Sequence, residues 1–127
     1  MQLVRVFALT GIIALAAGCS GSSYPTGGGG GGGGCTAGTD INVSVCDNSF
    51  KPAASPIKAN SSITWTWKGA VAHNVTFTSA PAGASLPAAS ATQSAGTSTR
   101  MFTTPGVYNY ECTIHVGVGM SGTVTVN

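Results

Sequence analysis

A short stretch near the carboxyl end of the chain holds three side chains that bind soft metal ions. It contains Cys112, His115 and Met120, with two residues between the first pair and four between the second. A strand that ends at the cysteine, followed by a tight loop, can aim all three donors at one point. The only other histidine, His73, supplies the fourth donor. Two imidazoles, a thiolate and a weak axial thioether are the ligands of a copper centre that transfers electrons.

Each of these residues has a simpler explanation when it is taken alone. His73 could be a hydrogen-bonded core residue, Cys112 a small buried apolar residue, and Met120 a side chain that fills a gap. Together, their spacing and their strand context favour a metal site. The soft sulfur donors favour copper over hard cations. Zinc would gain little from the methionine and normally takes a fourth strong ligand.

We expect β-strands to position these donors. Apolar residues alternate with polar ones in several segments of the chain. An alternation of period two indicates half-buried strands, and it occurs in residues 41–45, 63–67 and 124–126. On the same spacing, His73 shares a face with Val75 and Phe77, and Cys112 shares one with Tyr108 and Tyr110. We therefore expect both His73 and Cys112 to point into the same interior.

The remaining segments predict the fold class. Residues 79–99 are rich in Ala, Ser and Thr, contain Pro81 and Pro87, and lack an apolar stripe, so we expect a long surface loop there. No segment shows a convincing helical repeat. Short strands separated by turn residues predict an all-β protein, an antiparallel Greek-key β-sandwich of about seven or eight strands.

The order of the motifs resembles that of a known family. From about residue 40 to 127 the chain is similar to the cupredoxins, or blue-copper proteins, of the plastocyanin and pseudoazurin type. The resemblance rests on Phe50-Lys51-Pro52, Trp65-Thr66-Trp67, His73-Asn74-Val75, Tyr108 to Cys112, His115, and Met120 to Val126.

The resemblance implies a cupredoxin-like sandwich with His73, Cys112 and His115 as equatorial ligands and Met120 as the axial ligand. It also implies that backbone amides near Asn74 donate to the Cys112 sulfur. His115 is then expected at the surface, as the group through which electrons pass.

Two departures from the family pattern are visible. Asn60-Ser61 stands where a glycine turn is usual, and the neutral 79–99 segment replaces the acidic surface of many plastocyanins. The second departure argues against a photosynthetic partner.

Small or apolar residues flank the two histidines, and we expect them to form an apolar patch around the exposed edge of His115. They are Val71, Ala72, Val116, Gly117 and Val118. Such a patch suits brief docking of redox proteins, with less than about 1,200 Å² buried in the contact. The alternative is that these residues only shield the site from water.

The first residues predict export and attachment to a membrane. Residues 1–18 carry one positive charge and a short apolar run, as in a secretory signal. The residues before Cys19 resemble a bacterial lipobox, which implies a diacylglycerol-modified cysteine; ordinary signal cleavage nearby is the alternative. Residues 19–34, which include eight consecutive glycines, predict a flexible tether. Residues 35–127 remain as the folded domain of a periplasmic or cell-surface lipoprotein.

Cysteine usage predicts one disulfide. In an oxidising compartment, paired cysteines close and unpaired ones need another role. If lipid explains Cys19 and metal explains Cys112, then Cys35 and Cys46 are left to form a bridge. The alternatives are that either cysteine is free or pairs between molecules.

The charge composition excludes some classes of function. Charged residues make up 6% of the chain, and its formal net charge is +2. So few charges give no electrostatic basis for binding nucleic acid. For the same reason, we expect docking to be mostly apolar. We also expect a monomer. We interpret the chain as a one-electron carrier, with copper storage or delivery as the alternative. A copper oxidase or reductase would need further histidines, and the chain has only 2.

Overall fold

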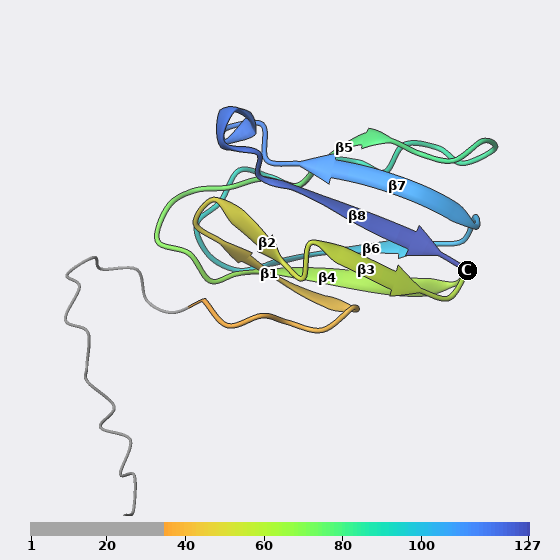
Figure 1. The fold of residues 1–127 in the computed structure, drawn as a ribbon, viewed down its shortest axis with the longest axis horizontal. Helices are drawn as coiled ribbons and strands as arrows, with labels where there is room; N and C mark the ends of the chain where they lie inside the picture. Colours follow the sequence, from red (N-terminus) through yellow and green to blue (C-terminus); the bar gives the residue numbers. More distant parts are fainter. Residues whose placement is uncertain (1–34) are drawn as a thin grey trace, which may run out of the picture.

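The computed structural model describes residues 35–127, which form a sandwich of two β-sheets (Figure 1). The elements are β1 (Asn42–Cys46), β2 (Ser49–Lys51), β3 (Ala54–Ile57), β4 (Ser61–Trp67), β5 (Thr76–Ser79), β6 (Thr97–Phe102), β7 (Gly106–Glu111), the 3₁₀ helix η1 (Val116–Val118) and β8 (Ser121–Val126). This part of the chain contains no helix with the length and hydropathy of a membrane span. The predicted signal segment, Cys19 and the tether lie outside the described residues.

Each sheet has four strands, in the orders β2-β1-β4-β6 and β3-β8-β7-β5. The predicted sandwich and strand number are therefore confirmed. The pairing is not antiparallel throughout, however, because β1 runs parallel to β4 and β3 runs parallel to β8. The chain leaves the first sheet after β2, contributes β3 to the second sheet, and returns as β4 beside β1. Alternation in the sequence fixes which face is buried, but it does not identify the neighbouring strand.

The two sheets pack around a core of alternating apolar residues. Trp65 lies at its centre, with edge-on contacts to Phe77, Phe102 and Tyr110 at ring-centroid distances of 5.8, 6.4 and 5.4 Å. Burial of side chains of this size contributes roughly 1.5–3 kcal/mol each, and edge-to-face ring geometry adds to this. The cluster joins β4 and β6 of one sheet to β5 and β7 of the other. It therefore holds the two sheets together.

The predicted 79–99 loop is shorter than expected, because β5 includes Ser79 and β6 begins at Thr97. The start of β6 consists of Thr and Ser without an apolar stripe, and its strand state comes from antiparallel pairing with β4. The intervening loop is held in place by hydrogen bonds. The Arg100 side chain donates to the carbonyls of Ala88 and Ala89, and His73 and Gln93 exchange backbone hydrogen bonds of 2.9 and 3.0 Å.

Asn60 occupies the turn where the resemblance leads us to expect a glycine. Its φ is +62°, in the left-handed region, which asparagine tolerates better than most residues with a side chain. The turn from β3 to β4 therefore keeps its backbone geometry without glycine.

The 3₁₀ helix η1, which lies in the loop between Cys112 and Met120, is at the end of the sandwich opposite the carboxyl terminus (Figure 1). Cys112 follows β7, Met120 precedes β8, and these two strands are antiparallel neighbours. His73 lies three residues before β5, which pairs with the other edge of β7. Strand pairing thus brings residues about 40 positions apart in sequence to the same edge.

Candidate metal centre

The loop from Cys112 to Met120 is closed by backbone hydrogen bonds. The Cys112 amide donates to the Met120 carbonyl at 3.0 Å, and the His115 amide donates to the Cys112 carbonyl at 3.0 Å. The η1 turn ends at Gly119, whose φ is +76°, a conformation that glycine adopts at little cost. The loop thus turns back onto the start of β8 with both of its ends fixed.

Three of the predicted ligands converge. Each of His73, Cys112 and His115 offers one donor atom, and these atoms all lie within 4.8 Å of one another. Nδ1 of His73 is 3.0 Å from Nδ1 of His115. The Cys112 Sγ atom is 3.8 Å from Nδ1 of His73 and 3.5 Å from Nδ1 of His115. The nearest atoms are soft or borderline donors, so the geometry and the donor chemistry both fit a copper ion.

Met120, the fourth predicted ligand, lies beside this cluster. Its side chain is buried, and its carbonyl accepts the Cys112 amide hydrogen bond. The residue is thus held at the base of the loop that carries the other two donors. Its assignment as the axial ligand stays a prediction.

His73 is fully buried and is held on three sides. The Trp67 indole N–H donates to its carbonyl at 3.0 Å, and Gln93 pairs with its backbone. The His73 Nε2 atom lies 3.2 Å from an oxygen of Asp47. A carboxylate can only accept, so the hydrogen is on Nε2 and the Nδ1 lone pair faces the cluster.

The Asp47 carboxylate also accepts from the backbone of the segment that leads to His73. The Ala70 amide donates to both of its oxygens at 2.9 and 3.1 Å, and the Val71 amide donates at 3.1 Å. Hydrogen bonds lower the pKa of Asp47 below its ordinary value. The bond from the Ala70 N–H has the largest effect, followed by those from the Val71 N–H and the His73 ring. The motif-based prediction missed Asp47; the available signal was that it is one of only 3 acidic residues in the chain.

Asn74 joins the His73 segment to the metal-binding loop through its side chain. The Thr113 amide donates to Asn74 Oδ1 at 2.9 Å, and Asn74 Nδ2 donates to the Thr113 hydroxyl at 2.7 Å. The resemblance implied a backbone amide near Asn74 as donor to the Cys112 sulfur; that donor stays a prediction. Thr113, immediately after the cysteine, is a positioning residue that the sequence did not reveal.

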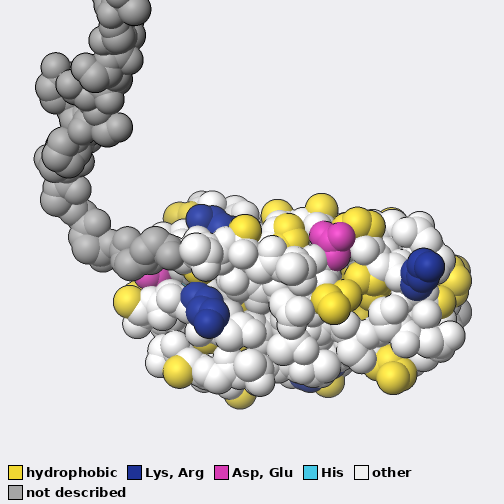
Figure 2. Space-filling view, turned by 90° about the horizontal axis from the view of Figure 1, so that it is seen from below, with side chains coloured by type: hydrophobic (Ala, Val, Ile, Leu, Met, Phe, Trp, Pro, Cys, Tyr) yellow, Lys and Arg dark blue, Asp and Glu magenta, His cyan; other side chains and the backbone are white. Residues whose placement is uncertain are grey.

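The predicted apolar residues that flank the two histidines in sequence are exposed, and His115 is half-buried. Val71, Val116 and Val118 have 46%, 51% and 65% of their surface exposed, and Ala72 and Gly117 are exposed as well. Ile114, which the prediction did not include, joins them. On another face of the molecule the few charged side chains are scattered (Figure 2).

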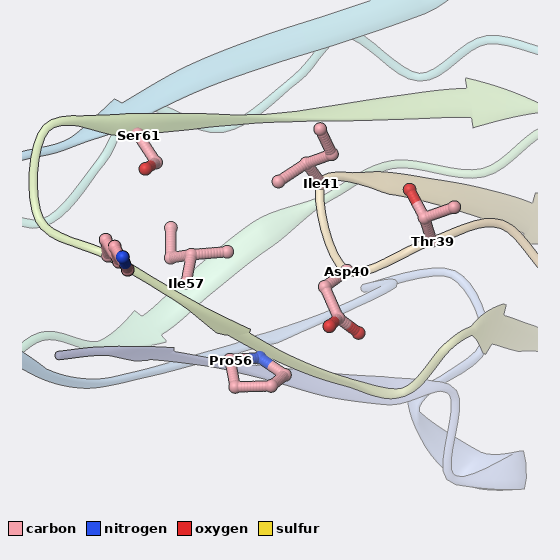
Figure 3. Close-up of a pocket in the computed structure, with 7 residues that line it drawn as sticks. Thr39, Asp40, Ile41, Pro56, Ile57 and Ser61 are labelled. Atoms are coloured by element: carbon pink, nitrogen blue, oxygen red, sulfur yellow. The ribbon is translucent and has the colours of Figure 1, made fainter.

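A separate cavity of about 540 Å³ lies at the start of β1. Asp47 and the donor cluster lie beyond the other end of that strand. Its lining includes Asp40, Ile41, Ile57 and Lys58 (Figure 3). It holds no histidine or cysteine. It therefore shares no donor with the metal centre.

The disulfide predicted by the cysteine count is present. Cys35 and Cys46 form a bridge with a Cα–Cα distance of 5.7 Å, and Cys112 is a free, buried thiol. The bridge fastens residue 35 to the end of β1, directly before Asp47.

Comparisons with known proteins agree with this geometry. A family described as copper binding proteins, plastocyanin/azurin family, matches residues 38–127. Plastocyanin from Prochlorothrix hollandica is 38% identical over 81 residues, which cover 61% of this chain and 62% of that protein. Amicyanin-alpha from Methylorubrum extorquens is 32% identical over 108 residues, which cover 85% of this chain and 90% of that protein. The solved structure of oxidized plastocyanin from Dryopteris crassirhizoma matches with a TM-score of 0.59 and 30% identity, over 68% of this chain and 99% of that chain.

In residues 35–127, the eight-stranded sandwich and the one cluster of two histidines and a cysteine define a cupredoxin with a metal centre. The cofactor of such a centre is copper. The chain belongs to the plastocyanin/azurin family of copper-binding proteins.

Replacing Asn74 tests whether its side chain holds the centre together. We expect Asn74→Ala to lower copper affinity about 10- to 100-fold, as observed when groups that orient metal ligands are removed. Loss of the two bonds to Thr113 should also lower the free energy of unfolding by about 1–3 kcal/mol. Competition with a chelator and thermal unfolding measure the two effects.

Asn109→Ala is the matched control, because the Asn109 side chain also bonds two neighbours, Ser79 and Thr123, away from the donor cluster. It should affect stability but leave copper affinity unchanged. Equal copper affinity in the two variants would show that Asn74 has no special role at the centre.

Proposed function

We propose that this protein is a one-electron carrier whose copper ion is held by His73, Cys112, His115 and Met120. The observation that carries the proposal is the convergence of three donor atoms within 4.8 Å, with only His115 reaching the surface. Bound copper supplies a Cu(II)/Cu(I) couple. The half-buried ring of His115 gives electrons a short path between the centre and a docked partner.

The surroundings of the donors favour electron transfer over storage or delivery of copper. His73 and Cys112 are fully buried, and Met120 is 1% exposed. Delivery requires ligands that exchange readily with a partner, whereas these side chains are fixed by the core and by backbone hydrogen bonds. A fixed set of two imidazoles, a thiolate and a weak thioether suits both oxidation states with little rearrangement.

We expect no reduction of oxygen or nitrite by this chain alone. Both histidines belong to the one centre, so the sequence has none left for a second copper site that could reduce oxygen or nitrite.

An optical spectrum of the oxidised, copper-loaded protein tests the proposal. We expect an intense visible band from thiolate-to-copper charge transfer that disappears on reduction and returns on oxidation. Cys112→Ser should abolish the band, because the serine oxygen cannot supply the thiolate. Ser121→Ala, next to the loop, should keep it. A colourless or redox-silent copper complex of the unaltered protein would contradict an electron-transfer role.

We further propose that Val71, Ala72, Val116, Gly117 and Val118 form the docking patch around His115. Their exposure supports this assignment, as does the net charge of +1 that four basic and three acidic residues give in residues 35–127. A weakly charged apolar contact permits fast release, which a carrier needs. We propose that the protein works as a monomer that meets its redox partners only briefly.

Electron self-exchange between two copies of the protein tests the patch without a known partner. Nuclear magnetic resonance line broadening in mixtures of the Cu(I) and Cu(II) forms measures the rate. We expect little salt dependence for the unaltered protein, and about a tenfold slower rate for Val116→Asp, within the usual range of mutational effects on association.

Val107→Asp is the control. Val107 lies on β7, outside the patch, and its exposed fraction of 48% is close to the 51% of Val116. The introduced charge should slow self-exchange only at position 116. An equal effect at both positions would show that the patch is not the docking surface.

For the remainder of the chain we propose export through the signal segment 1–18 and anchoring by lipid on Cys19. The Cys35–Cys46 bridge supports an extracytoplasmic location, since disulfides persist in oxidising compartments. A tether of residues 19–34, rich in glycine and serine, would let residues 35–127 reach membrane-bound partners.

Cell fractionation tests the anchor. In a bacterial host that lipidates exported proteins, the unaltered chain should remain with the membranes, and Cys19→Ala should appear in the soluble extracytoplasmic fraction. Ser20→Ala, one residue further along, should behave like the unaltered chain. Membrane retention of the Cys19→Ala protein would contradict lipid anchoring at this residue.

A further inference from the structure

Asp47 connects a turn of the first sheet to the metal centre. It follows β1, and its carboxylate accepts hydrogen bonds from the Ala70 and Val71 amides and from Nε2 of His73. One side chain therefore holds both the segment that leads to the ligand and the ring of the ligand itself. Asp40 and Glu111, the other two acidic residues, form no hydrogen bond with either histidine.

Gly69 provides independent evidence that this arrangement is built into the fold. A Cβ atom at residue 69 would collide with the Asp47 carboxylate and would lie 2.8 Å from the Asp47 backbone nitrogen. The φ of Gly69 is not in the left-handed region, so its backbone conformation does not require glycine. The missing side chain makes room for Asp47 to reach the Ala70 and Val71 amides.

The turn that carries Asp47 is itself fixed. Cys46 lies in the disulfide with Cys35, and the Lys68 and Gly69 amides donate to the Val45 carbonyl at 2.9 and 3.1 Å. The carboxylate thus extends from a rigid hairpin to a ligand that precedes β5 of the other sheet.

We propose that Asp47 is a positioning residue that fixes the tautomer of His73 and lowers the reduction potential of the centre. This inference rests on the proposed copper function. With its hydrogen on Nε2, His73 presents the Nδ1 lone pair to the metal. A carboxylate that accepts from Nε2 makes the imidazole a stronger electron donor. Stronger donation stabilises Cu(II) more than Cu(I), because Cu(II) carries the higher charge.

The direct hydrogen bond carries this effect, and the long-range charge of Asp47 contributes little. The carboxylate is 38% exposed, so water screens its field. Asp40→Asn removes the same charge at the far end of β1 and serves as the matched control.

Asp47→Asn is the test, because the amide keeps the shape of the side chain but is a weaker acceptor. We expect the ratio of Cu(II) affinity to Cu(I) affinity to fall about tenfold. For a one-electron couple this raises the reduction potential by about 59 mV. Redox titration measures it, and Asp40→Asn should leave the potential unchanged.

Two further measurements separate this role from a loss of structure. In the diamagnetic Cu(I) protein, the Nε2–H of His73 should give an exchange-protected resonance that Asp47→Asn exposes to exchange with water. Gly69→Ala keeps the negative charge but displaces the carboxylate, and it should raise the potential in the same direction. Thermal unfolding shows that each variant is folded before its potential is compared.

The outcomes distinguish the inference from the proposed function. If the unaltered protein shows the visible band and a reversible couple, but Asp47→Asn and Asp40→Asn have equal potentials, the role of Asp47 is refuted and the carrier function stands. If the unaltered protein lacks the band, the proposed function fails first.

Discussion

The pairing of β7 with β8 sets the geometry of the metal-binding loop. It places Cys112 and Met120 side by side, joined by the hydrogen bond between the Cys112 amide and the Met120 carbonyl. The loop between them then has only enough length to turn His115 back toward the cysteine. Because β5 pairs with the other side of β7, the His73 segment arrives at the same edge. A metal centre made of residues from distant parts of the sequence thus follows from the order of three strands.

The core and the polar contacts make this edge rigid in different ways. The aromatic cluster around Trp65 packs one sheet against the other, so β5 and β7, which lead to the two ligand segments, cannot leave the core without loss of buried area. Asn74 and Asp47 then determine orientation: Asn74 joins the His73 segment to Thr113, and Asp47 holds the far nitrogen of the His73 ring. Rigidity of this kind suits a carrier, since electron transfer is fastest when the ligands move little between the two oxidation states.

The sequence predicted the sandwich and the faces of the main strands because alternation is a local property. It predicted the disulfide and the convergence of His73, Cys112 and His115 because the chain has only 4 cysteines and 2 histidines, in an order that resembles the cupredoxins. It did not predict the parallel pairs β1–β4 and β3–β8, since pairing partners are chosen by the whole fold. The start of β6 was interpreted as loop because Thr97 to Thr99 lack an apolar stripe. Asp47 and Thr113 were missed for a related reason: their roles arise from contacts 26 and 39 positions away along the chain.

A crystal structure of the oxidised, copper-loaded protein would show whether the four side chains bind one ion. We expect a single copper ion bonded to Nδ1 of His73, Sγ of Cys112 and Nδ1 of His115, with the Met120 sulfur as the fourth and weakest ligand. Copper bound elsewhere, or any of those first three side chains turned away from the ion, would contradict it.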